Sequence, residues 1–242
     1  MTGAGLLERV LAAHGGSEAW ARVRCVEATL SSGGLAFSSH GQGSALLGLH
    51  VRVHPHGRRV ELGGYTGHGR TGLWAPDRVT IRDAGGNPLA DRDFPRRSFG
   101  RLTRLVRWDA LDMLYFAGYA LWNYLSFPFL LMEPGVVVAE SPPLAGRGGG
   151  RLVVDFPTGF PTHSPRQVFH VDEPGHLLRH DYTADVIGRL ATAANLCLAG
   201  GEAAGLRFYT RRRVVPRFGE SLVLPGPTLV WIEIDDIRLA FG

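Results

Sequence analysis

The chain has 242 residues, 45% of them hydrophobic and 20% charged, with a formal net charge of +4, which is typical of a soluble globular protein and not of a disordered or fibrous one. All 26 basic residues are arginine, so the absence of lysine excludes a Schiff-base nucleophile, a pyridoxal anchor and a Walker A phosphate loop. Cys25 and Cys197 are too few for a disulfide framework or a thiolate metal site. Because all-β domains often reach this length, we predict one domain over residues 1–242.

The chain begins with a predicted helical segment. Apolar residues between 6 and 23 recur at a spacing compatible with one or two short helices, broken at Gly15 and Gly16, with Ser17 as the N-cap of the second. The first residues lack a basic region, and Glu8 and Arg9 interrupt their apolar stretch. This pattern does not predict a signal peptide, and we therefore expect a cytoplasmic location.

Short strands follow the helical segment. Five partly alternating runs are separated by Gly, Pro, Asp and Asn, and they cover residues 22–30, 33–40, 47–53, 58–62 and 77–83. Their close spacing is typical of an antiparallel meander, and there is no βαβ rhythm.

The middle of the chain contains the longest apolar run. After an arginine-rich stretch over 94–108, residues 113–132 carry no charge, and apolar residues recur every three or four positions from Leu111 to Leu125. Asp109 or Asp112 suits the first turn of a helix, and Pro128 should end or kink it. The run has the length of a membrane span, but strands on both sides must pair. We therefore predict a buried helix and no transmembrane segment.

The second half of the chain returns to strands. They are predicted over 135–140, 151–157, 166–172, 176–183, 206–216 and 229–239, with a flexible loop over 142–150. Residues 191–205 are compatible with either a short helix or a bent strand. The pattern predicts a mainly β (α+β) fold, a strongly curved antiparallel half-barrel of about eleven strands that wraps a central apolar helix and has an N-terminal helix.

Four segments carry a family resemblance. "LAAHGGSEAWARVRCVEATL" (11–30), "RQVFHVDEPGHLLRHDY" (166–182), "GLRFYTRRRVV" (205–215) and "LVWIEIDDIRL" (229–239) resemble the leading helix, hairpin, late strand and final strand of the LolA/LolB-like lipoprotein-carrier superfamily. The resemblance implies a half-barrel that holds an acyl chain between sheet and helices. Members are normally exported, so without an export signal the chain resembles a divergent cytoplasmic member.

The hairpin contains four histidines, His163, His170, His176 and His180. On one strand, His176 and His180 share a face but lie about 13 Å apart at the rise of a β-strand, which is too far to bind one metal ion. His163 and His170 are seven residues apart and point to opposite faces. We therefore predict no metal site and no cofactor.

Two interpretations of this hairpin remain open. A three-residue loop would place His170 opposite Leu178 and Val168 opposite His180, and a shift by one residue would reverse the faces. In one interpretation the histidines face solvent or form ordinary hydrogen bonds. In the other, His180 and Tyr182 share a face and project into a cavity as acid-base or hydrogen-bonding groups, while Asp181 points away.

A second group of residues is predicted to line a pocket. These are Tyr115, Phe116, Tyr119, Trp122 and Asn123 in the apolar helix, with Phe169 and Trp231 in strands. Aromatic residues on a helix are equally compatible with core packing. Polar-tipped rings and an asparagine in an otherwise apolar segment are nevertheless typical of pocket walls.

The basic stretch "TRRRVVPR" (210–217) was considered as a nucleic-acid patch. Strand alternation separates Arg212 from Arg211 and Arg213, so we predict no nucleic-acid partner. Our leading hypothesis is binding of a hydrophobic small molecule or acyl chain in the hollow of the sheet. The alternative is a cofactor-independent enzyme, a cyclase, isomerase or hydrolase that acts on an apolar substrate through His180 and Tyr182. Whether the chain is an enzyme, and its oligomeric state, are left open.

Overall fold

The computed structural model describes residues 5–144 and 149–242. Two short helices, α1 (Leu6–Ala13) and α2 (Ser17–Ala21), form the start of this part. Gly15 and Gly16 separate them with φ of 100° and 85°, values that glycine adopts without steric cost. The predicted break is confirmed, but α2 begins one residue earlier than expected, because Gly16 is its N-cap and Ser17 its first residue.

The strands of the described residues form one antiparallel sheet. Its first half comprises β1 (Val23–Gly33), β2 (Leu46–His54), β3 (Arg59–Gly63), β4 (Thr71–Ala75), β5 (Arg78–Arg82) and β6 (Pro88–Asp93). Its second half comprises β7 (Val137–Ser141), β8 (Gly150–Asp155), β9 (Arg166–Val171), β10 (Leu177–Thr183), β11 (Thr192–Ala203), β12 (Leu206–Phe218), β13 (Leu222–Val223) and β14 (Val230–Phe241). These are 14 strands where the sequence indicates about eleven. The strands β4, β6 and β13, which have two to six residues, were not predicted, and the long β11 was left open between a helix and a strand.

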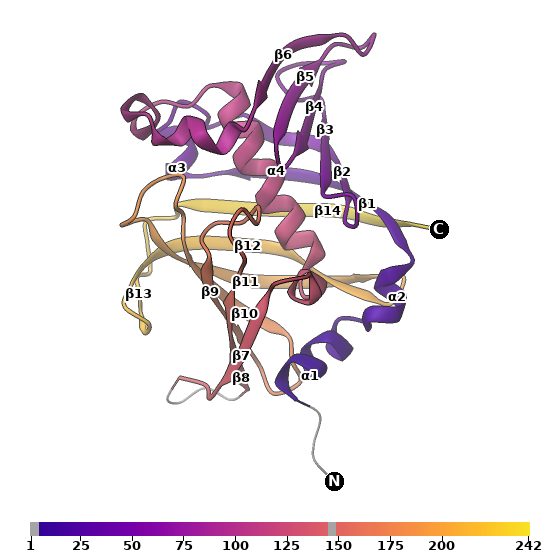
Figure 1. Ribbon diagram of the computed structural model, residues 1–242, viewed down its shortest axis with the longest axis vertical. Coiled ribbons are helices and arrows are strands. Elements are labelled where there is room, and N and C mark those ends of the chain that lie inside the picture. Colours follow the sequence, from indigo (N-terminus) through magenta and orange to yellow (C-terminus); the bar gives the residue numbers. More distant parts are fainter. Residues whose placement is uncertain (1–4, 145–148) are drawn as a thin grey trace.

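The strand order is β6-β5-β4-β3-β2-β1-β14-β12-β11-β10-β9-β8-β7, with β13 paired to β12. The last strand, β14, therefore lies in the middle of the sheet and joins the two meanders, as Figure 1 shows. The strands β6 and β7 are the two free edges, so the sheet is open and does not close into a barrel.

The central helix α4 (Ala110–Ser126) lies against one face of this sheet (Figure 1). It contacts both β4 and β12, which are separated in the strand order by β3, β2, β1 and β14. Five strand spacings of about 4.8 Å exceed the width of a helix, so the sheet bends around α4. Almost every side chain of α4 is buried, as predicted for a helix that is apolar all round.

Both ends of α4 agree with the sequence. The Asp109 carboxylate accepts a hydrogen bond from the Asp112 backbone N–H at 2.9 Å, and the Asp112 carboxylate accepts one from the Asp109 N–H at 3.0 Å. This reciprocal arrangement is a capping box. Near Pro128 the chain leaves the helix and forms a single 3₁₀ turn, η3 (Phe129–Met132). Among residues 5–144 and 149–242, no helix combines the length and apolar character that spanning a bilayer requires.

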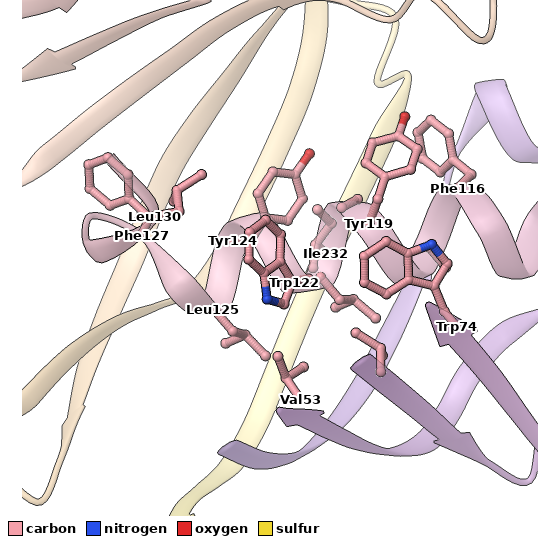
Figure 2. Close-up of a cluster of buried hydrophobic side chains, with 14 of the residues drawn as sticks. Val53, Trp74, Phe116, Tyr119, Trp122, Tyr124, Leu125, Phe127, Leu130 and Ile232 are labelled. Atoms are coloured by element: carbon pink, nitrogen blue, oxygen red, sulfur yellow. The ribbon is translucent and has the colours of Figure 1, made fainter. Parts of the chain in front are cut away.

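The core between α4 and the first half of the sheet is tightly packed. Figure 2 shows Trp74 and Val53 beside α4, with Leu125 pointing toward Val53. Trp74 packs against the glycine of the helix, Gly118, where an added Cβ would lie 2.2 Å from the Trp74 Cγ. Only a residue without a side chain allows this close approach.

Two predicted segments differ from the structure. Residues 33–40 were expected to form a strand, but the chain turns at Gly34 (φ 126°) into the single-turn helix α3 (Leu35–Ser38). Residues 191–205 contain the bent strand β11, and not the helix, with irregular pairing to β12 on both sides of Ala199. The arginine-rich stretch contains the 3₁₀ turns η1 (Pro95–Gly100) and η2 (Leu102–Leu105). The middle of the predicted 142–150 loop lies outside the described residues.

Candidate functional site

A chain of buried polar groups joins α4 to the second half of the sheet. The Tyr119 hydroxyl lies 3.1 Å from His163 Nδ1, and the Tyr124 hydroxyl lies 2.8 Å from His163 Nε2. Tyr124 continues to the Tyr182 hydroxyl at 3.3 Å, and the rings of His163 and Tyr182 are stacked with centroids 3.8 Å apart. Figure 2 shows the hydroxyls of Tyr119 and Tyr124 pointing to the same side of α4. All four side chains are buried.

In this series of hydrogen bonds, the proton of one tyrosine hydroxyl is left without an acceptor. A neutral imidazole donates from one nitrogen and accepts at the other. If Tyr119 donates to His163, then His163 donates to Tyr124, Tyr124 donates to Tyr182, and the Tyr182 proton has no further acceptor in this set. In the reverse orientation the free proton belongs to Tyr119. The network can therefore offer a hydrogen bond at either end, and Tyr182 is among the residues that border a cavity.

A second polar group surrounds His180. Its Nε2 lies 2.5 Å from the Gln167 side-chain oxygen, and Gln167 donates through its amide nitrogen to the Thr162 hydroxyl and the Ser164 carbonyl. Because the amide nitrogen is used in this way, the oxygen faces His180, which therefore donates from Nε2. The His180 ring stacks on Phe169 with centroids 4.2 Å apart.

Burial keeps all of these groups neutral. Desolvation lowers the pKa of His163 to about 3, assisted by the nearby charge of Arg96, and it lowers the pKa of His180 well below its usual value. Burial also raises the pKa of Tyr182 and of Tyr119 well above that of an exposed tyrosine. Near neutral pH these side chains act as hydrogen-bonding dipoles.

Two small cavities flank Tyr124. The first, of about 30 Å³, is almost entirely apolar and lies between α4, α3 and the strands β1, β2, β10, β12 and β14. Phe116, Leu121, Tyr182 and Ile232 are among its walls. The second, of about 10 Å³, lies beyond Tyr124, next to Arg212 and His180. Cavities of this size have room for about one water molecule each.

The structure places the predicted residues in two groups. Five border the two cavities: Phe116, Asn123, Phe169, His180 and Tyr182. His180 and Tyr182 share the interior face, with ring centroids 4.8 Å apart, but each makes its hydrogen bond to a different partner. Asp181 points away from them to Arg179 and His170.

The other predicted pocket residues lie elsewhere. Trp122 donates from its indole to the Pro55 carbonyl and packs under Arg58, while Tyr115 packs on Phe99. Tyr119 contacts His163 without bordering either cavity.

The structure does not place Trp231 beside the cavity, where the sequence predicted it. Strand alternation turns its neighbours Val230 and Ile232 to the apolar cavity, and Trp231 lies beside Gly33 on the opposite face.

The structure decides the hairpin register, which the sequence leaves open. His170 lies opposite Arg179, and His180 opposite Phe169, where a three-residue loop would have placed Leu178 and Val168. An irregularity between Leu177 and Arg179 shifts the pairing by one residue. The shift brings Phe169 under the His180 ring.

Three central residues were missed by the sequence reasoning. His163 lies in a segment without regular structure between β8 and β9, so no periodicity indicates its direction. Tyr124 has no feature in the sequence that distinguishes it from the other aromatic residues of the apolar helix. Arg212 was treated as part of a divided basic stretch, although its even-numbered spacing from Phe208 and Val214 places it on the buried face.

No cluster of three or more metal-ligating side chains occurs within the part of the chain that the structure describes. His170 and His176 instead lie beside carboxylates, His170 Nε2 at 2.9 Å from Asp181 and His176 Nδ1 at 3.2 Å from Asp172. Cys25 and Cys197 are free thiols. The predictions of no metal site and no cofactor stay predictions.

Comparison with known proteins shows similarity of fold only. No family model matches the sequence, and no curated protein matches it. A LolA superfamily protein from Nitrosomonas europaea is similar in structure, with 10% identity and a TM-score of 0.49 over 97% of this chain and 92% of that protein. A DUF1329 family protein from Desulfovibrio piger has 14% identity and a TM-score of 0.46 over 98% and 92%.

Proposed function

We propose that this chain binds a hydrophobic small molecule or an acyl chain between α4 and the bent sheet. The apolar cavity beside α4 carries the proposal. Its walls combine bulky apolar side chains, among them Leu30, Phe37 and Leu121, with the side chains of Tyr124 and Tyr182. An apolar pocket with a few placed polar groups is the usual form of a small-molecule site.

The cavity must widen to accept such a ligand. At about 30 Å³ it holds far less than a drug-sized molecule. The shortest element of its wall is α3, one helical turn that contributes Phe37 and is held by hydrogen bonds from the backbone N–H groups of Leu35 and Ala36. The rings of Phe37 and Phe116 are in edge contact, with centroids 5.7 Å apart. We expect the Phe37 ring to turn away from Phe116 when a ligand enters.

The buried histidines and tyrosines of the site favour binding over acid-base catalysis. An efficient general base has a pKa near the working pH. The pKa of His163 is about 3, because burial disfavours its charged form. Burial likewise lowers the pKa of His180 well below, and raises that of Tyr182 well above, the ordinary value of each group. The side chains are therefore suited to orienting a polar end of a ligand.

Titration with the fluorescent apolar probe N-phenylnaphthylamine tests this proposal. We expect a saturable, one-to-one increase in probe fluorescence with the wild-type protein. Ala120→Phe adds a ring to the cavity wall and should abolish the increase. Ala90→Phe makes the same change on the exposed surface of β6 and should not.

Circular dichroism establishes that each variant is folded, and Ala117→Val provides a smaller change in the same wall. Absence of a saturable signal in the wild type would reject the proposal. So would unchanged probe binding by folded Ala120→Phe.

A further inference from the structure

Arg212 is a buried cation without an anionic partner. It lies in β12 with 1% of its surface exposed, and no ion pair among the described residues includes it. Its Nη1 donates to the Cys197 sulfur at 3.5 Å, and its guanidinium lies over the rings of Tyr124 and Tyr209 at 4.6 and 5.2 Å. Because burial raises the pKa of Cys197, that sulfur is a neutral thiol and not a counter-charge.

Arg179 provides a contrast within the same sheet. It is 3% exposed, yet its Nη2 donates to Asp181 at 2.7 Å and to the Glu220 carbonyl at 2.9 Å. A buried charge costs several kcal/mol unless it is paired and hydrogen-bonded. Arg179 has a carboxylate partner within the chain, although its Nε makes no hydrogen bond, whereas Arg212 has no ion pair among the described residues.

The unpartnered atoms of Arg212 form one recognisable unit. They are Nε and Nη2, the two nitrogens on one edge of the guanidinium, whose N–H groups point in the same direction. This edge matches the two oxygens of a carboxylate in a bidentate pair.

Arg212 borders the smaller cavity, and Tyr124 separates that cavity from the apolar one. The apolar cavity extends along α4 from Tyr124 back to Phe116, a distance of about 12 Å at the rise of an α-helix. A molecule with an acidic end at Arg212 would therefore continue directly into apolar surroundings once the Tyr124 ring moved aside.

We propose that Arg212 binds the carboxylate of an amphipathic ligand, of the fatty-acid type, whose apolar tail occupies the cavity along α4. This inference rests on the proposed function for the position of the tail. It adds the chemical class of the ligand.

Binding of decanoate and decanol by the purified protein, measured by calorimetry, tests the inference. The two ligands share a tail and differ in charge. We expect the wild type to bind decanoate about 10- to 100-fold more tightly, the range for hydrogen bonds to a charged group. Arg212→Met should remove this preference and leave decanol and N-phenylnaphthylamine binding unchanged. Arg211→Met, at the exposed neighbouring position, should keep it.

Stability of the ligand-free variant separates this role from a structural one. If Arg212 serves to bind an anionic ligand, Arg212→Met removes an uncompensated charge from the ligand-free protein. The midpoint of urea unfolding should then equal or exceed that of the wild type. A large fall in the midpoint would contradict the inference, because it would mean that the contacts with the two tyrosines stabilise the fold. Arg212→Lys keeps the charge without the paired N–H groups and should lose most of the preference.

The possible failures are distinguishable. Equal affinity of the wild type for decanoate and decanol, with N-phenylnaphthylamine still bound, overturns the carboxylate site and leaves the proposed function intact. Loss of all three ligands in the wild type overturns both.

Discussion

The hydrogen bonds of one interior histidine, His14, assign its tautomer. His14 Nδ1 lies 2.7 Å from the Val10 carbonyl and therefore carries the proton, while its Nε2 accepts from the Tyr209 hydroxyl at 2.9 Å. Burial lowers the pKa of His14 to about 4. With His163 and His180, three imidazoles are thus held neutral in the folded chain.

These histidines make stability depend on pH. Each has a folded-state pKa below the unfolded value of about 6.5, so below that pH the unfolded chain binds more protons. Stability is therefore full above about pH 6.5 and falls as the pH drops toward the folded-state values, by up to about 1.4 kcal/mol per pH unit for each histidine. Urea unfolding at pH 7, 6 and 5 measures the slope of the free energy of unfolding against pH. His163→Gln should reduce this slope by the contribution of one histidine.

The exposed His50 provides the control. We expect His50→Gln to leave the slope of stability against pH as in the wild type. A wild-type slope in His163→Gln would show that His163 is not the neutral buried group described above.

The direction of single side chains was predictable only inside regular strands. Alternation correctly places His180 and Tyr182 on one face and Asp181 on the other. The same rule would have placed Arg212 inside, next to Val214. It has no application to His163, because residues 156–165 form no strand.

At the scale of elements, α4 is anchored by more than its own capping box. The buried Asp112 carboxylate also accepts hydrogen bonds from Arg92 at 2.6 Å and from Ser98 at 2.8 Å, and it pairs with Arg104 at 2.9 Å. Hydrogen bonds from Arg92 and from the backbone N–H of Asp112 outweigh burial and lower the pKa of Asp109 to about 2. The start of α4 is thereby tied to β6, η1 and η2.

The contact between α4 and β4 depends on one glycine. Gly118→Ala places a methyl group 2.2 Å from the Trp74 ring, and Trp74 is completely buried, so neither can move freely. We expect a loss of about 1–3 kcal/mol in the free energy of unfolding, despite the higher helix propensity of alanine. Urea unfolding measures it.

Gly100→Ala is the matched change in open space, since nothing lies within 4 Å of the added Cβ. It should be close to neutral. A stabilised Gly118→Ala protein would mean that α4 and β4 are not in close contact.

Elements were predictable where they are long and missed where they are short. The 17 residues of α4 have their own periodicity and caps. The two residues of β13 are held only by their partner β12, and α3 is a single turn. For such pieces neighbouring strands outweigh local preference.

At the scale of the whole molecule, β14 unites the sheet. It pairs with β1 from the start of the chain and with β12, so the two meanders share a continuous ladder and one helix. We therefore predict a single cooperative unfolding transition, in which tryptophan fluorescence and far-ultraviolet circular dichroism coincide.

Two matched core changes sharpen this prediction. Leu62 in β3 and Leu152 in β8 are both completely buried, one in each half. Leu62→Ala and Leu152→Ala should each cost about 2–5 kcal/mol and shift both probes together. Two transitions, each moved by only one of the variants, would show separate domains.

The sequence by itself determined the mainly β class, the buried capped helix and the shared face of His180 and Tyr182, because each depends on periodicities within a few residues. The tertiary structure decided that this shared face is turned inward. Only the tertiary structure decided which polar groups meet. The grouping of His163, Tyr124 and Tyr182 depends on the place of an irregular segment against α4, and the isolation of Arg212 depends on strand order and register. Those are set by packing between residues far apart in the chain, for which a single sequence contains no local signal.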